Sequence, residues 1–114
     1  MSFQIYDVSE YEPESAHDLA VEEDKVEFNL SPGELRQALM DRVRGDVKSG
    51  EAFFLNMNFE RYGLSVEEDD LEDDEYARSF LMDAENVIYD LVDADMDGSL
   101  WEFSNERILV RGEV

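Results

Sequence analysis

The segment Asp93-Ala94-Asp95-Met96-Asp97-Gly98-Ser99-Leu100 has the residue spacing of a calcium-binding loop. Oxygen ligands stand at positions 1, 3 and 5, a glycine at position 6 and an apolar residue at position 8, as in an EF-hand. Position 12, which supplies a bidentate glutamate in that motif, is Ser104, and Glu102 comes too early. We therefore predict an Asp-Gly turn and no metal site, with calcium binding as an alternative.

The other residues with chemical potential are carboxylates, and they are concentrated in one part of the chain. Residues 67–97 hold 14 of the 31 acids and a single base, Arg78. Clustered charge of one sign attracts a cationic surface and repels nucleic acid and anionic membranes. We therefore predict a partner-binding surface made of Glu67, Glu68, Asp69, Asp70, Glu72, Asp73, Asp74, Glu75, Asp83, Asp90, Asp93, Asp95 and Asp97.

Catalytic and redox chemistry find little support in the sequence. The chain has no cysteine, which excludes a disulfide scaffold, a thiolate zinc site and a cysteine nucleophile. His17 is the only histidine and stands in an acidic segment with no positioned partner for acid–base work, so we expect a surface residue. Carboxylate pairs are too common here to indicate a glycosidase. We expect no enzymatic activity and no cofactor.

The composition predicts one folded domain over residues 1–114. Hydrophobic residues make up 43% of the chain and aromatic residues 11%, which is enough for a core. The formal net charge of −22 makes the compact state repel itself, so either a salty habitat or a function that uses the negative field must offset that cost. Residues 1–5 lack the features of a signal peptide and no apolar run could span a membrane, so we expect a cytoplasmic protein.

Two helices are predicted to position these charges. Ser31-Pro32-Gly33-Glu34 is typical of a helix start with a capping box, and Ser49-Gly50 ends that helix. A second helix is predicted from about Asp73 to Val92. Its apolar stripe is Tyr76, Phe80, Ala84, Val87, Ile88 and Leu91, and its opposite face carries Ser79, Asp83, Asn86, Asp90 and Asp93. Carboxylates one or two turns apart on that face are roughly 6–11 Å apart, a spacing comparable to that of DNA phosphates.

Five strands are predicted around the helices, at residues 3–8, 25–30, 52–60, 99–103 and 107–112. The order β-β-α-β-α-β-β predicts an α+β domain, with a mostly antiparallel sheet of about five strands and two helices packed on it. Val26, Phe28 and Leu30 alternate along 25–30 and predict one half-buried face. Trp101 is expected in the core. If 3–8 is an edge strand, it offers a site for a second copy, although we favour a monomer.

Two stretches resemble the small acidic double-stranded-DNA-mimic proteins, a family that includes the neisserial DNA mimic that binds the histone-like protein HU. Residues 53–63, Phe-Phe-Leu-Asn-Met-Asn-Phe-Glu-Arg-Tyr-Gly, are similar to a strand and turn of that family, and residues 97–111 are similar to its C-terminal hairpin. Together these stretches cover about 26 of the 114 residues. The resemblance implies an α+β fold, no catalysis and HU as the partner.

These observations predict a DNA mimic that binds a basic DNA-binding protein and modulates its access to DNA. A phage inhibitor of a restriction or CRISPR complex, or an immunity protein for a nuclease, would use the same physics. A calcium-binding module and a halophile domain with charge set by habitat are further alternatives. The identity of the partner stays open, as does any role in binding for residues 7–27, which carry nine acids.

Overall fold

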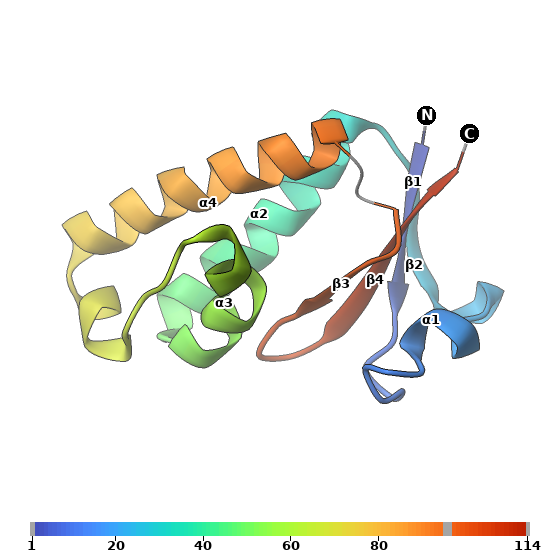
Figure 1. The fold of residues 1–114 in the computed structure, drawn as a ribbon, viewed down its shortest axis with the longest axis horizontal. Helices are drawn as coiled ribbons and strands as arrows, with labels where there is room; N and C mark the ends of the chain where they lie inside the picture. The colour runs from blue at the N-terminus through green and yellow to red at the C-terminus, as the bar shows by residue number, and fades with distance from the viewer. Residues whose placement is uncertain (1, 95–96, 114) are drawn as a thin grey trace.

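The computed structural model describes residues 2–94 and 97–113 and has an α+β architecture, as predicted. Its antiparallel sheet has four strands in the order β2-β1-β4-β3 (Figure 1). The strands are β1 (Ser2–Asp7), β2 (Lys25–Leu30), β3 (Ser99–Glu102) and β4 (Arg107–Glu113). The α-helices are α1 (Ala16–Leu19), α2 (Pro32–Ser49), α3 (Ala52–Phe59) and α4 (Asp74–Ala94), joined by the short 3₁₀ helices η1 (Glu22–Asp24), η2 (Glu60–Tyr62) and η3 (Glu68–Glu72).

The two helices predicted from capping and periodicity are present. The Ser31 hydroxyl accepts a hydrogen bond from the Glu34 amide, and the Glu34 carboxylate accepts one from the Ser31 amide, so the capping box of α2 forms. Gly50 ends α2 with a left-handed φ of 75°, a conformation that glycine adopts without steric cost. Helix α4 buries Phe80, Ala84 and Ile88.

The predicted strand at 52–60 is wrong, because these residues form α3 and the start of η2. The aromatic residues of this segment favour a strand, but helical spacing lets both Leu55 and Phe59 enter the core. Buried Asn58 adds a second reason, because its side-chain amide donates to the Glu102 carbonyl (2.8 Å) and its carbonyl accepts from the Glu102 amide (2.9 Å). These tertiary contacts outweigh local strand propensity. The segment that resembled a strand of the DNA-mimic family is therefore helical.

Two expectations about the sheet are also corrected. Strand β1 pairs with both β2 and β4, so it lies inside the sheet and is not an edge strand. Irregularities in the β1–β2 register displace the alternation of β2, which leaves Val26 49% exposed and Phe28 63% exposed instead of half-buried. Glu27 faces α2, where its carboxylate accepts a hydrogen bond from Arg42 at 3.2 Å.

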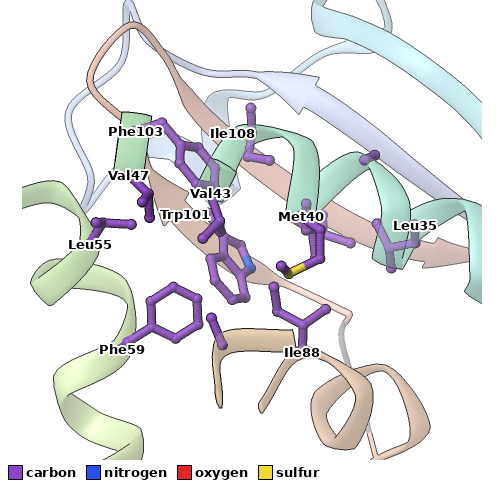
Figure 2. Packing of buried hydrophobic residues seen from close by; sticks show 14 of the residues in the cluster. Leu35, Met40, Val43, Val47, Leu55, Phe59, Ile88, Trp101, Phe103 and Ile108 are labelled. Atoms are coloured by element: carbon purple, nitrogen blue, oxygen red, sulfur yellow. The ribbon is translucent and has the colours of Figure 1, made fainter. Parts of the chain in front are cut away.

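The core between the sheet and helices α2, α3 and α4 is centred on Trp101, which is fully buried as predicted. Figure 2 shows its indole ring surrounded by Val43, Phe59 and Ile88. The Trp101 ring lies 5.7 Å from the Phe59 ring and is stacked on Phe103 at 6.4 Å. This packing fixes the position of α4 relative to the sheet. A smaller cluster on the other face of the sheet includes Ala16 of α1.

Candidate partner-binding surface

Helix α4 presents an acidic face along the length of the molecule. With 21 residues it is about 31 Å long, and it runs close to the long axis (Figure 1). Asp83, Asp90 and Asp93 are exposed on the side opposite its buried residues. Asp83 and Asp90 are two turns apart, which separates them by about 10 Å along the axis. Met82 is exposed on the same side and was not among the predicted site residues.

The acidic run before α4 continues this face around one end of the molecule. Buried Leu71 anchors η3 in the core, so the acids around it are held on a fixed backbone. The following carboxylates are exposed, except that Asp70 is half-buried: Glu67, Glu68, Asp69, Asp70, Glu72, Asp74 and Glu75. Together with Asp83, Asp90 and Asp93 these residues are called the acidic surface below.

Asp73 belongs to the same run but has a structural role. Its Oδ1 accepts hydrogen bonds from the backbone amides of Glu75 (2.9 Å) and Tyr76 (3.4 Å). These are amides at the start of α4 that have no partner within the helix, so Asp73 acts as the helix cap. Asp73, which the sequence analysis places in the binding site, is exposed and also caps α4, so it is treated separately from the acidic surface.

The acidic surface has no cationic partner within the described chain. The salt bridges join Lys25 to Glu22, Arg42 to Glu27 and Glu106, Arg44 to Asp41, and Arg107 to Glu102. Within residues 67–93, all of which the structure describes, no acid forms a salt bridge. Lys25, Arg42, Arg44 and Arg107 therefore pair with acids of α2, the sheet, the β3–β4 turn and η1. Arg78 is the one base among residues 67–93, so the acidic surface keeps a strong net negative field.

The described end of the segment that resembles a calcium loop, residues 97–100, is a turn that leads into a strand, whereas an EF-hand continues as a helix. The Asp97 carboxylate accepts a hydrogen bond from the Gly112 amide (3.0 Å), and the Gly98 amide donates to the Val110 carbonyl (2.8 Å). Strand β3 begins at Ser99. Asp95 lies outside the described residues. Among the residues that are described, no three His, Asp or Glu side chains are grouped closely enough to hold a metal ion.

A groove beside α3 was missed by the sequence analysis. It has a volume of about 360 Å³ and is lined by Asn56, Glu60, Ser65, Val66, Glu67, Asp70 and Tyr76. The groove was missed because a strand was predicted at 52–60. In a helix Asn56 and Glu60 are neighbours on one face, whereas in a strand they would be two positions apart along that face. The helical spacing of Phe53, Met57 and Glu60 was the signal that could have revealed this face.

Asp46 is a titratable residue that the sequence analysis also missed. It lies on α2 with only 3% of its surface exposed. Its Oδ1 accepts a hydrogen bond from the Ser104 hydroxyl at 2.9 Å, which ties α2 to the β3–β4 turn, while its Oδ2 has no protein partner among the described residues. Burial raises the pKa of Asp46, and the hydrogen bonds from Ser104 partly oppose that rise. By contrast, His17 is exposed, as predicted.

Comparison with protein-family models, with curated proteins and with solved structures gives no significant match to this chain. The resemblance to the DNA-mimic family therefore stays a prediction, and function must be argued from the surface itself. None of the helices in residues 2–94 and 97–113 has the length and apolar composition that crossing a membrane requires.

Proposed function

We propose that this chain binds a basic DNA-binding protein through its acidic surface and competes with DNA for that protein. The observation that carries the proposal is the exposure of the carboxylates along η3 and α4, with no salt bridge to any of them within residues 67–93. Self-repulsion raises the electrostatic free energy of a domain with a formal net charge of −22, and binding of a cationic partner lowers it.

The arrangement of the charges favours mimicry of DNA over a diffuse attraction. The acids of α4 project from one rigid helix, and those two turns apart are separated by about 10 Å along its axis. A protein that contacts successive phosphates with Lys and Arg meets a comparable series of charges on this face. Since phosphate contacts dominate the affinity of such proteins for DNA, occupying those cations is sufficient to displace it.

The first partner to test is the nucleoid protein HU, because the resemblance in residues 53–63 and 97–111 implies it. Of these two stretches, 97–111 contains the expected hairpin and 53–63 is helical. The location that fits this role is the cytoplasm. Restriction complexes, CRISPR complexes and secreted nucleases present cationic DNA-binding grooves of the same kind. They are alternative partners for the same surface. Binding measurements of the chain with a panel of such proteins distinguish these alternatives from HU.

Calorimetric titration of purified HU with three forms of the full chain tests the proposal. The α4 triple variant, Asp83→Asn with Asp90→Asn and Asp93→Asn, removes three charges from the acidic surface. The control triple variant, Glu10→Gln with Glu12→Gln and Glu14→Gln, removes three exposed charges on the far side of the sheet (Figure 1). We expect the α4 triple variant to weaken binding about ten-fold, since each exposed pair contributes about 0.2–1 kcal/mol.

The control should change the affinity by less than about two-fold at moderate salt, because the removed charges lie on the other side of the sheet from α4 and salt screens their interaction with the partner. Equal weakening by the two triple variants would show that net charge alone drives binding. If no member of the partner panel binds the wild-type chain at low or moderate salt, the proposed function is wrong.

A further inference from the structure

Helix α3 leaves an apolar face uncovered. Phe53 is 68% exposed and Met57 is 49% exposed. They are four residues apart, so their side chains are neighbours on one side of the helix, while Leu55 and Phe59 are buried on another. We call Phe53 and Met57 the apolar pair. Exposed apolar side chains that lie together in this way are a common mark of a protein-binding site.

The same side of α3 continues into the groove described above. Asn56 and Glu60 line the groove and follow Phe53 and Met57 by three residues, which makes them neighbours of the apolar pair on the helix surface. Three of the described residues that line the groove are acids, and none of them is a base. An apolar anchor and an acidic groove therefore adjoin each other.

The wall of the groove is held in place before any ligand arrives. The Asn56 side-chain amide donates to the Val66 carbonyl at 2.7 Å, and its side-chain carbonyl accepts from the Val66 amide at 2.9 Å. Val66 is buried in the core, so these two bonds fix the chain that runs from η2 to η3 against α3. Such pre-organisation lowers the entropic cost of binding.

The groove suits an organic cation. Its lining includes the carboxylates of Glu60, Glu67 and Asp70 and no base. A guanidinium group is always charged and presents its donors in a planar fork that matches the geometry of a carboxylate. Tyr76, which is 41% exposed in the groove wall, offers a ring face for a cation–π contact.

We infer that the groove and the apolar pair form one docking site for a basic protein segment that presents an arginine next to an apolar side chain. The inference rests on the proposed function, since it takes the partner to be a basic protein, and it adds apolar recognition that DNA mimicry alone does not require. Charge complementarity selects this occupant. A second copy carries the same formal net charge of −22 and is repelled, as is nucleic acid.

Two synthetic peptides of equal length and charge test this inference on the full chain. One alternates arginine with leucine and the other alternates arginine with serine. We expect calorimetry to show that the leucine-containing peptide binds about ten-fold more tightly, because each buried apolar side chain adds about 1.5–3 kcal/mol when fully covered. Its addition should shift the backbone amide NMR signals of Asn56, Glu60 and Val66.

A double variant and a control variant test whether the preference for the leucine-containing peptide depends on the apolar pair. Phe53→Ser with Met57→Ser should abolish the ten-fold preference for leucine and leave binding of the serine-containing peptide unchanged. Met82→Ser, at an apolar residue 65% exposed on α4, should retain the preference. The substituted side chains are exposed, and a circular-dichroism melt checks that each variant is folded.

Equal affinity for the two peptides would overturn the inference, as would a leucine preference that persists in the double variant. Amide shifts confined to α4 or to residues 7–24 would also overturn it. Dimerisation of the wild-type chain that the double variant abolishes would assign the apolar pair to a second copy instead. In each case the proposed function still stands if the α4 triple variant weakens HU binding, so the two failures are distinguishable.

Discussion

Individual aspartates of this chain have opposite environments, and these decide what each one does. Asp46 is buried, with one carboxylate oxygen bonded to Ser104 and the other without a protein partner among the described residues. The Asp73 carboxylate accepts a hydrogen bond from the Glu75 amide at the start of α4. Asp83 and Asp90 are exposed, outside any salt bridge of the described chain. Residue type alone does not separate these roles, because burial and partners come from the tertiary structure.

Asp46→Asn should change how the stability of the fold depends on pH. Burial raises the pKa of Asp46 above its ordinary value of 3.8, so the native state holds this proton more tightly than the unfolded chain. The contribution of Asp46 to the free energy of unfolding is therefore complete below pH 3.8 and is lost as pH rises through the folded pKa. Urea unfolding should show the variant gaining stability relative to wild type between about pH 4 and about pH 7. A difference in the free energy of unfolding between the variant and wild type that is equal at both pH values would contradict this account.

Asp73→Ala should lower the free energy of unfolding by about 1 kcal/mol, because two amides at the start of α4 lose their acceptor. Asp69→Ala is the matched control, since it removes the same charge from an exposed position in η3. Urea unfolding of both variants at neutral pH is the measurement. An equal change in the two would mean that Asp73 acts through its charge and not as a cap.

At the scale of elements, local signals predicted α2, α4 and the β3–β4 hairpin well. The capping box at Ser31, the left-handed Gly50 and the 3.6-residue stripe of α4 each depend on residues close in the sequence. Helix α3 was mispredicted because its aromatic residues favour a strand, while the bonds of Asn58 to Glu102 that favour the helix join residues 44 positions apart. The missed groove follows from that error. The exposed face of α4 needed only helical periodicity, and this helix carries five of the ten residues of the acidic surface, while the other five follow from the acidic run before it.

The α4 triple variant should be more stable than wild type in dilute buffer. Asp90 and Asp93 are like charges three residues apart, which costs about 0.2–0.5 kcal/mol, and Asp93 is close to the negative C-terminal end of the helix dipole. Neutralising them should raise the free energy of unfolding by about 1 kcal/mol, and the gain should shrink in high salt. Urea unfolding at two salt concentrations measures both effects. A loss of stability would mean that these carboxylates make favourable contacts.

At the scale of the whole molecule, a core centred on Trp101 supports a surface with a formal net charge of −22. We predict that the wild-type chain stays folded in dilute buffer and that its melting temperature rises with added salt as self-repulsion is screened. Thermal unfolding followed by circular dichroism across a salt series is the measurement. A chain that folds only near molar salt would indicate that the charge reflects a halophilic habitat, and the argument for a binding surface would lose its basis.

The central claim is that the acidic surface occupies the site where a basic protein holds DNA. Fluorescence anisotropy of a labelled DNA duplex bound to HU, followed as the chain is added, tests it most directly. We predict that the wild-type chain releases the duplex, that the α4 triple variant requires about ten-fold more protein to do so, and that the affinity of the chain for HU falls with salt as the affinity of DNA does. A ternary complex in which HU holds both the duplex and the chain would contradict the claim.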